Sequence, residues 1–421
     1  MTYNPAYTKK IYDAVHGFIR FNELERELID SDPFQRLHYL HQLGISFLVY
    51  PGATHTRFEH SLGAMELATR IFDRIASKHS RTDVDLDYWR QIIRLAALCH
   101  DLGHLPFSHV AEKVLLGKGG HEKWTLAVIQ SDQLKSIWDK LQKRHPERNV
   151  TSDLIKMALG AKKAEEIGLD LPFTPWEKVM TEVITGDFFG ADRIDYLLRD
   201  AQCTGVSYGL FDYHQLIEML CILPTPGDPK GSLELGIEEN GMESCEALLL
   251  ARHFMHQRVY QYSSSNAYSF HLARFLKQFY SQGNYLESLD AYLTMTDNEV
   301  LSALRRAAIE PNALGHADAR ALLKRHDRFL AIELKKGIGE ENLKKLQQLL
   351  AIASDAISWN LAKEKLDDRP PTFPVLKRSG AIVDSSQCSK ILIPTGSQSW
   401  VFIAPAFERP FREALEEITS P

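Results

Sequence analysis

The stretch "DYWRQIIRLAALCHDLGH" (residues 87–104) joins a mostly apolar pattern to a strongly polar end. Its apolar residues recur at helical spacing, which predicts a buried helix over 87–99 with Asp87 as the N-cap. The helix then ends in the adjacent pair His100 and Asp101. Because neighbouring side chains on a helix point about 100° apart, both can reach one cation that lies between them. Imidazole and carboxylate together suit Zn, Fe, Mn and similar divalent ions.

A second helix, predicted over residues 58–77, carries two apolar stripes. One stripe runs from Leu62 to Ile75, and the other begins at His60 and runs to Ile71. Two stripes indicate burial over a wide arc, with His60 facing inward. The fold class is mainly α, since further helices are predicted over 121–130, 132–144, 151–159, 175–200, 212–221, 241–262 and 266–280, and residues 287–365 are again predicted to be helical.

Strand signals are few. The segment "SLELGIEE" (232–239) is followed by "NG" and predicts a small β-hairpin. Beyond the helix-breaking "DDRPPTFP", the segments "SKILIPTG" and "SWVFIAPA" alternate like two strands, and "RPFREALEEI" predicts a short closing helix. We therefore expect three parts: a helical core over 1–285, a helical extension over 286–366 and a small C-terminal α+β appendage over 367–421.

The bulk properties narrow the classes of function. The chain has 421 residues, of which 25% are charged, and a formal net charge of −6. The negative net charge argues against a nucleic-acid partner, because proteins that bind nucleic acid usually carry a basic surface. Five cysteines without a CxxC spacing argue against a disulfide framework and a cysteine zinc site. The N-terminus has no apolar signal segment and no apolar run is long enough to cross a bilayer, so we expect a cytoplasmic protein without a membrane partner.

One His-Asp pair cannot complete a metal site, and two further residues are candidates. His60 lies in "RFEHSLG" and Asp192 in "GDFFGADRIDYLLRD". With His100 and Asp101 they would offer two nitrogen and two oxygen ligands and leave positions open for water and substrate. Each residue also has a plainer interpretation. A His-Asp dipeptide is common, His60 fits a hydrogen-bonded core histidine, and Asp192 fits an N-cap.

A helix through the segment of Asp192 would sort its polar side chains onto two faces. Tyr196 and Asp200 follow Asp192 at intervals of four residues and share its face. Asp195 and Arg199 form a separate pair one turn apart. We interpret that pair as a solvated salt bridge rather than as metal ligands.

Several segments, in one order over residues 9 to 280, resemble a known family. They include "YPGATHTRFEHSLG", "LCHDLGHLPFSHVAE", "GHEKW", "ADRIDYLLRDAQCTG" and "FMHQRVYQYS". The H…HD…D pattern resembles the HD-domain metal-dependent phosphohydrolases, and the fuller text resembles their deoxynucleoside triphosphate (dNTP) triphosphohydrolase branch. The resemblance implies an HD-domain helical core and hydrolysis of a dNTP to deoxynucleoside and inorganic triphosphate.

The resemblance also implies a cofactor. It assigns one divalent ion, which could be Mn, Fe, Zn, Ni or Mg, to His60, His100, Asp101 and Asp192. A further Mg²⁺ could accompany the nucleotide. The ligand set alone does not choose among these ions, because an imidazole and carboxylate set suits several of them.

Catalytic and phosphate-binding roles are implied for five residues. Arg57 matches a phosphate-binding arginine of the family, and His104 matches a histidine beside the phosphates. His109 matches another, and we expect it to protonate the leaving 5′ oxygen, a task that suits an imidazole near neutral pH. His121 matches a further catalytic histidine, and Glu112 stands where the mammalian relative has Asp.

Substrate-binding roles are implied for two groups. Gln42 and Leu43 match positions against the deoxyribose, where a close wall would exclude a 2′-hydroxyl group. Arg193 stands where the mammalian relative has Lys, and Tyr196 and Asp200 match residues near the sugar. A later predicted helix carries a polar stripe on an otherwise apolar surface. A solvent-facing stripe is the plainer interpretation, whereas the resemblance places four residues in the pocket: Arg252, His256, Tyr260 and Gln261.

The resemblance also implies partners. Members of the branch form dimers or tetramers with nucleotide effectors between subunits, so we expect a homo-oligomer and a dNTP substrate, and a modified site for a nucleotide effector stays open. Asp30 and Gln35 match the effector segment, whereas Lys10, Tyr12 and His38 depart from it. Two alternatives stay open. The first is an HD phosphohydrolase that acts on a nucleoside monophosphate, a cyclic dinucleotide or an alarmone, and the second is a nucleotide-sensing HD protein without turnover.

Overall fold

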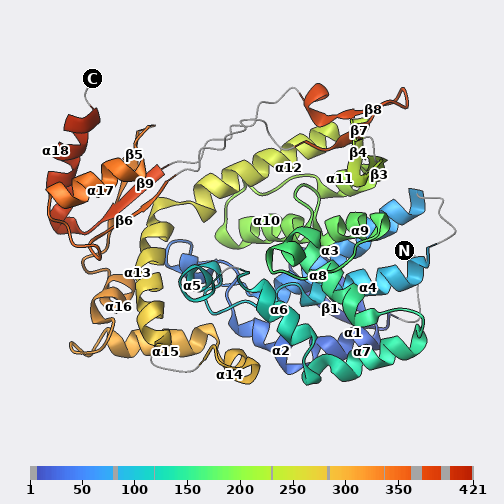
Figure 1. Ribbon diagram of the computed structural model, residues 1–421, viewed down its shortest axis with the longest axis horizontal. Coiled ribbons are helices and arrows are strands. Elements are labelled where there is room, and N and C mark those ends of the chain that lie inside the picture. The colour runs from blue at the N-terminus through green and yellow to red at the C-terminus, as the bar shows by residue number, and fades with distance from the viewer. Residues whose placement is uncertain are drawn as a thin grey trace. The chain divides into compact units, whose positions relative to one another are not determined.

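The structure is a computed structural model (Figure 1) that describes residues 7–78, 84–117, 119–228, 231–281, 285–335, 337–361, 372–389 and 399–419. Within these ranges the chain forms eighteen α-helices and nine short strands, so the predicted mainly-α fold is confirmed. The chain divides into two compact units. The first comprises Met1–Arg252, Tyr285–Asp297 and Pro371–Ile393, and the second comprises His253–Asn284, Asn298–Pro370 and Pro394–Pro421.

The first unit holds most of the helices. An antiparallel hairpin of β1 and β2 opens it, and a four-stranded sheet in the order β3-β4-β7-β8 belongs to it as well. Its elements are β1 (Lys9–Asp13), β2 (Gly17–Phe21), α1 (Glu23–Ile29), α2 (Asp32–Gln35), α3 (Arg57–Lys78), α4 (Leu86–Cys99), α5 (His109–Leu115), α6 (Glu122–Ile129), α7 (Asp132–Arg144), α8 (Val150–Glu166), α9 (Pro175–Thr185), α10 (Ala191–Thr204), α11 (Tyr213–Met219), β3 (Leu220–Pro224), β4 (Leu233–Glu238), most of α12 (Met242–Met255), α14 (Leu289–Leu293), β7 (Pro374–Leu376) and β8 (Ile382–Asp384).

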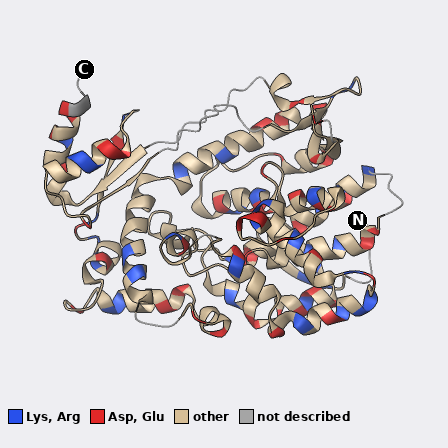
Figure 2. Ribbon diagram, in the orientation of Figure 1, with Lys and Arg blue, Asp and Glu red and all other residues tan. Residues whose placement is uncertain are grey.

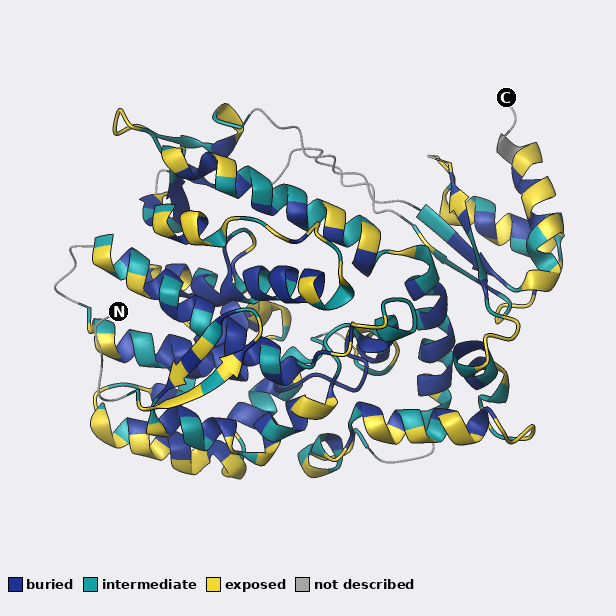
Figure 3. Cartoon of the chain, turned by 180° about the vertical axis from the view of Figure 1, so that it is seen from behind, coloured by how far each residue is buried: buried dark blue, intermediate teal, exposed yellow. Residues whose placement is uncertain are grey.

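Helix α3 is the centre of this unit's core. It packs against α4, α9 and α10, and much of this group is dark blue in Figure 3. Every member of both predicted stripes is buried, which confirms the two-sided burial of α3. At Gly63, α10 comes so close that a Cβ atom would lie 1.9 Å from Asp195 Oδ1. Because real Cβ atoms do not approach other atoms that closely, only glycine fits this crossing.

Several predicted helix boundaries in this unit are wrong, including the end of the helix expected over 151–159, which continues to Glu166 as α8. The helix expected over 175–200 is two helices, because Gly186 ends α9 and Gly190 is the N-cap of α10. Helix α4 begins one residue early, and Asp85 rather than Asp87 caps it by accepting a hydrogen bond from Tyr88 N at 3.0 Å. These differences arise from local backbone geometry that periodicity does not encode.

The predicted strand at 232–239 exists, but its turn is elsewhere. It is β4, and it pairs antiparallel with β3 across residues 225–232. The "NG" dipeptide at 240–241 lies in a short 3₁₀ turn that leads into α12 instead of closing a hairpin. The helix predicted over 212–221 correspondingly ends at Met219, where β3 begins. The strands β1 and β2, which are short and carry several charged residues, were not predicted.

The second unit combines helices with a three-stranded sheet. Apolar side chains of the sheet, α17 and α18 form one core that includes Ile332, Leu346, Val401 and Phe411. Its elements are α13 (Ser263–Tyr280), most of α15 (Asp297–Ala307), α16 (His316–Leu323), β5 (Leu330–Leu334), α17 (Glu340–Leu349), β6 (Ile357–Asn360), β9 (Ser399–Ile403) and α18 (Glu408–Thr419), and a π-helical turn (His256–Tyr260) precedes α13.

Predictions for this part of the chain were partly correct. The strand expected in "SWVFIAPA" is β9, and the closing helix is α18. The range 287–365 is not helical throughout, because β5 and β6 lie within it and both pair antiparallel with β9. The strand expected in "SKILIPTG" lies, except for its first residue, outside the described residues.

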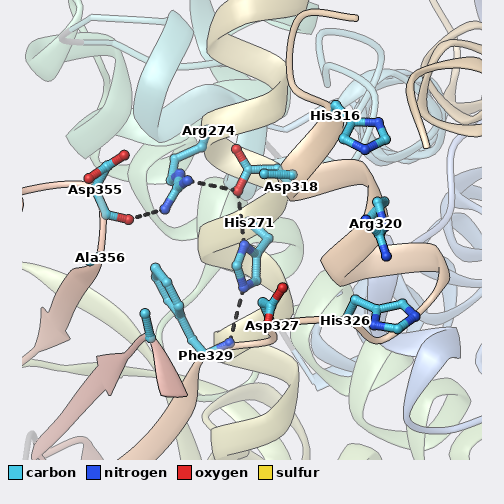
Figure 4. A pocket seen from close by; sticks show the side chains of 12 residues that line it. His271, Arg274, His316, Asp318, Arg320, His326, Asp327, Phe329, Asp355 and Ala356 are labelled. Atoms are coloured by element: carbon cyan, nitrogen blue, oxygen red, sulfur yellow. Dashed lines mark hydrogen bonds and ion pairs between the residues drawn. The ribbon is translucent and has the colours of Figure 1, made fainter. Parts of the chain in front are cut away.

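A pocket of about 250 Å³ in the second unit is lined by a polar network (Figure 4). Buried Asp318 binds His271 Nδ1 at 2.9 Å and Arg274 Nη2 at 3.1 Å. His271 Nε2 accepts a hydrogen bond from Phe329 N at 3.1 Å, so His271 is neutral and carries its proton on Nδ1. The network joins α13, α16 and the start of β5.

Charges of both signs are interspersed along helices such as α7 (Figure 2). This mixture agrees with the ordinary charge balance of the sequence. Among the residues that the structure describes, no helix combines the length and the apolar character needed to cross a membrane.

Candidate metal centre and histidine cluster

Four side chains that are far apart in the sequence meet in the first unit. His60 lies near the start of α3, His100 and Asp101 follow α4, and Asp192 is in the first turn of α10. His60 Nε2 lies 3.3 Å from His100 Nε2, 3.0 Å from Asp192 Oδ1 and 3.6 Å from Asp101 Oδ2. His100 Nε2 lies 3.4 Å from Asp101 Oδ1 and 3.6 Å from Asp192 Oδ1. Asp192 is half-buried and the other three are buried.

The hydrogen bonds of the two imidazoles fix where their protons lie. His100 Nδ1 is 2.7 Å from the carbonyl oxygen of Ala97, which can only accept, so this Nδ1 carries a proton. His60 Nδ1 likewise donates to Asp195 Oδ2 at 2.8 Å. In their neutral forms the two rings therefore turn unprotonated Nε2 atoms toward each other. Two lone pairs at this distance repel unless a cation lies beside them.

The spacing of these donor atoms fits one metal ion. Donors bound at about 2.1 Å from an ion lie roughly 3.0–3.4 Å from one another. Each imidazole Nε2 lies 3.0 to 3.6 Å from the nearest oxygens of Asp101 and Asp192, and donor atoms of His60, His100 and Asp101 lie close enough together to hold one ion. The residues present therefore suit a divalent cation of the Zn, Fe or Mn kind, as the sequence predicted, while their assignment as ligands stays a proposal.

The electrostatic surroundings favour positive charge at this point. Burial alone lowers the pKa of His60, but hydrogen bonds with Asp192 and Asp195 outweigh it and raise the pKa to about 10. Burial alone would also lower the pKa of His100, but the nearby negative charge of Asp101 opposes this effect, and the pKa is raised above its usual value. Although burial favours the neutral carboxyl group of Asp192, hydrogen bonds with both imidazoles hold its pKa below the usual value. Carboxylates that favour a proton on His60 favour a metal cation for the same reason.

We expect the metal-free protein to lose stability as the pH rises from about 6.5 to about 10. The pKa of His60 is raised from 6.5 to about 10 in the fold, so the folded state binds this proton more tightly than the unfolded chain. The contribution, on the order of a few kcal/mol, is complete below the unfolded pKa and disappears as the pH passes the folded pKa. Thermal melting of chelator-treated protein across this pH range measures the loss. The variant His60→Gln should flatten the profile, and an unchanged profile would assign the loss to other groups.

Asp195 supports His60 from its Nδ1 side, and the interpretation of Asp195–Arg199 as a solvated pair is wrong. Both residues are buried. Arg199 Nε donates to Asp195 Oδ2 at 2.9 Å, Arg199 Nη1 donates to Asp13 Oδ2 at 2.8 Å, and His16 Nε2 lies 2.6 Å from Asp195 Oδ1. The spacing of residues along α10 shows that the helix has two polar faces, but it does not show that α3 covers the face of Asp195 and Arg199. A glycine one turn after His60 was the available signal for that close approach.

A second group of histidines surrounds Glu112. Its carboxylate accepts from His104 Nδ1 at 2.5 Å, His109 Nδ1 at 3.0 Å and His121 Nδ1 at 3.1 Å. Despite its burial, the charge of His104 and these hydrogen bonds hold the pKa of Glu112 far below its usual value. The four residues lie close enough to hold an ion, but their shared hydrogen bonds to one carboxylate already account for the closeness. Each imidazole keeps its Nε2 for another partner.

The two groups are connected. His104 Nε2 lies 3.2 Å from Asp101 Oδ1. Buried Arg57 donates from Nε to Ser108 Oγ at 2.8 Å and from Nη1 to Asp101 Oδ2. With 70% of its side chain exposed, His109 is the most open of the three histidines around Glu112. The cluster thus offers one accessible imidazole beside the candidate metal centre.

Two arginines converge on Asp187. Arg193 Nη2 lies 3.3 Å from Asp187 Oδ1, and Arg252 Nη1 donates to the Asp187 carbonyl at 3.1 Å. Among the described residues, the buried Nε of Arg193 has no hydrogen-bond partner. Burial and the charge of Arg193 both lower the pKa of Arg252, and burial raises the pKa of Tyr196. Cations this close together suit an anion that carries several charges.

The residues predicted to contact the sugar are in different situations. Gln42 N donates to the His55 carbonyl at 3.0 Å, but the buried Gln42 Oε1 has no partner among the described residues. Leu43, next to it, is half-buried. Asp200 is buried and binds His55 Nε2 at 2.7 Å, so it holds the loop that carries His55. Three further residues lie in the second unit, and their roles stay predictions of the resemblance: His256, Tyr260 and Gln261.

A helical core that gathers two histidines and two aspartates around one point, beside a histidine cluster, defines an HD-type phosphohydrolase. Comparison with protein families agrees, because the HD domain matches residues 57–184 and the HD associated region matches residues 211–358. The chain belongs to the HD-domain family. These proteins are metal-dependent phosphohydrolases, which places the chain among the hydrolases.

Similar proteins come from several organisms. An uncharacterized protein of Methanocaldococcus jannaschii is 37% identical over 60% of this chain and 46% of its own length. The deoxynucleoside triphosphate triphosphohydrolase SAMHD1 of Gallus gallus is 28% identical over 86% of this chain and 61% of its own length. The chain thus spans about half to three fifths of the length of these curated relatives. A crystal structure of a hypothetical protein from Aquifex aeolicus is 30% identical, with a TM-score of 0.75, and covers 97% of this chain and 99% of its own.

Proposed function

We propose that the protein hydrolyses dNTPs to deoxynucleoside and inorganic triphosphate with one divalent metal ion. The observation that carries the proposal is the pair of facing Nε2 atoms on His60 and His100, enclosed by two carboxylates. Positive charge is favoured between these atoms, either as a proton on His60 or as a metal ion, and a metal ion that can accept further oxygen ligands is suited to a phosphate and a water molecule. The finer choice of substrate rests on the surroundings of this centre.

Three features support a deoxynucleoside triphosphate over other phosphate esters. The paired cations Arg193 and Arg252 suit a substrate with several negative charges, more than a monophosphate carries. Gln42 Oε1, which is buried and has no hydrogen-bond partner within the described residues, suits a hydroxyl donor of a sugar. A relative that is similar over 86% of this chain bears the name of a dNTP triphosphohydrolase.

The reaction would divide the work among the chain's own side chains. The metal ion, when bound, supplies Lewis acidity to a phosphate oxygen and acidifies a water molecule. Arg193 and Arg252 bind the phosphates and offset the charge that grows on them. Attack of water at the α-phosphorus breaks its bond to the 5′ oxygen. His109, held through Nδ1 by ionised Glu112, donates a proton from Nε2 to that leaving oxygen.

Analysis of the products tests the proposal. Purified protein supplied with Mn²⁺ or Fe²⁺ and each dNTP should release inorganic triphosphate together with the deoxynucleoside, and a chelator should stop the release. Pyrophosphate, single phosphate, or turnover of a monophosphate, cyclic dinucleotide or alarmone instead would identify another HD reaction. Binding of dNTP without any product would indicate a nucleotide sensor.

A further inference from the structure

We propose that Asp297 is a positioning residue that fixes the distance between the loop predicted to hold the sugar and the loop that carries His109. The inference rests on the proposed function for its ligand but on geometry for its mechanism. Asp297 is the first residue of α15, belongs to the first unit and is fully buried. No residue assigned to the site by the sequence or the resemblance lies in this part of the chain.

The carboxylate of Asp297 bridges two segments that are distant in sequence. Oδ2 accepts from His41 N at 2.8 Å and from His41 Nδ1 at 2.6 Å. Oδ1 accepts from Phe107 N at 2.9 Å. Three donors therefore share two acceptor oxygens. An amide could not replace this group, because it offers one acceptor oxygen and adds two donors of its own.

Each arm of the bridge ends beside a residue of the proposed site. On one side, His41 is followed directly by Gln42, whose buried Oε1 has no partner among the described residues. On the other side, Phe107 is followed by Ser108, which accepts from Arg57, and then by His109. The Asp297 carboxylate therefore ties the segment of Gln42 to the segment of His109.

The second loop would not keep its shape alone. Phe107 and Ser108 have φ angles of 58° and 47°, in the left-handed region that non-glycine residues seldom adopt. Such backbone persists where the surrounding structure holds it, and Asp297 binds the amide of the first strained residue. The two loops also touch, since a Cβ atom on Gly44 would lie 3.4 Å from the Phe107 carbonyl oxygen.

The consequence concerns substrate choice rather than metal binding. A nucleotide with its sugar against Gln42 and its 5′ oxygen near His109 must match the gap that Asp297 sets. Within the described part of the chain, the three hydrogen bonds of Asp297 go to His41 and Phe107 and to none of the four candidate metal ligands. Loosening the bridge should therefore relax the exclusion of a 2′-hydroxyl and slow turnover while the metal stays bound.

The test is the variant Asp297→Asn in the full chain, compared with Asp318→Asn as a matched control. Asp318 is equally buried and also binds a histidine, but it lies in the second unit. We expect Asp297→Asn to lower the preference for deoxy- over ribonucleoside triphosphates, measured as the ratio of kcat/KM values, by at least about tenfold. Bound metal should stay at the wild-type level, and the control should keep its preference within about twofold. A preference unchanged in Asp297→Asn overturns the proposal.

Two further measurements keep the proposal testable if folding or the substrate assignment fails. Should Asp297→Asn not fold, His41→Ala removes only the imidazole arm, and an unchanged sugar preference in that variant overturns the proposal. Amide hydrogen exchange needs no substrate. Exchange at His41 and Phe107 should be roughly tenfold faster or more in Asp297→Asn, even if the wild-type protein proves inactive on dNTPs. Equal exchange in both proteins would contradict the bridge whatever the substrate is.

Discussion

The variant Asp192→Asn should lose bound metal and hydrolytic activity together, each by more than about a hundredfold. Asp192 Oδ1 lies 3.0 Å from His60 Nε2 and 3.6 Å from His100 Nε2, so this single oxygen faces both imidazoles. An amide keeps the shape but removes the negative charge that holds a cation there. Elemental analysis of the purified variant and release of inorganic triphosphate are the two measurements.

Asp132→Asn is the matched control for this loss. Asp132 is an exposed residue in the first turn of α7, so the same change of charge there should leave metal and activity at wild-type levels. Full activity and full metal content in Asp192→Asn would remove Asp192 from the centre. Loss of activity with metal retained would instead give Asp192 a role toward the substrate.

The variant Glu112→Gln should keep its metal but lose activity by about 10²- to 10⁴-fold, the usual contribution of general acid catalysis. The amide cannot accept from three Nδ1 atoms, so His109 would lose the partner that orients it. Burial and the charge of His104 already lower the pKa of His121, and Glu112 opposes them. Removing that negative charge should lower the pKa of His121 further, which NMR titration of its imidazole measures.

Glu122→Gln provides the comparison for this variant. Glu122 lies 3.7 Å from His121 Nδ1 but makes none of the three hydrogen bonds that Glu112 makes, so we expect at most a few-fold loss. If the two variants lose activity equally, negative charge near His121 matters and the shared carboxylate does not. If Glu112→Gln loses its metal, the histidine cluster acts through the metal centre.

The helices were predictable to the extent that their signals are local. The expected helix over 132–144 is α7 without any shift, because its apolar spacing and its flanking residues lie within the segment itself. The strands were less predictable, since a strand is defined by its partner. β5 and β6 both pair with β9, which begins more than sixty residues after β5 ends. No pattern within "LAIEL" or "ISWN" indicates that partner.

The same distinction applies to the site. His60, His100, Asp101 and Asp192 could be nominated from residue type and from the resemblance, and the structure brings them together. Asp195 and Asp297 could not be nominated in that way. Each acts through residues contributed by distant segments, and helical periodicity shows which face a side chain shares but not what covers that face.

The close crossing of α3 and α10 at Gly63 has a consequence for substitutions at that position. His60 and Asp192 sit on opposite helices of that crossing, so the gap between them is governed by a position where the side chain is a single hydrogen atom. An alanine there would wedge the helices apart against Asp195 and Arg199. Adding one methyl group a turn away from His60 would therefore separate His60 from Asp192 and abolish metal binding as fully as the loss of a ligand. Mutagenesis of the charged residues alone would not reveal this dependence.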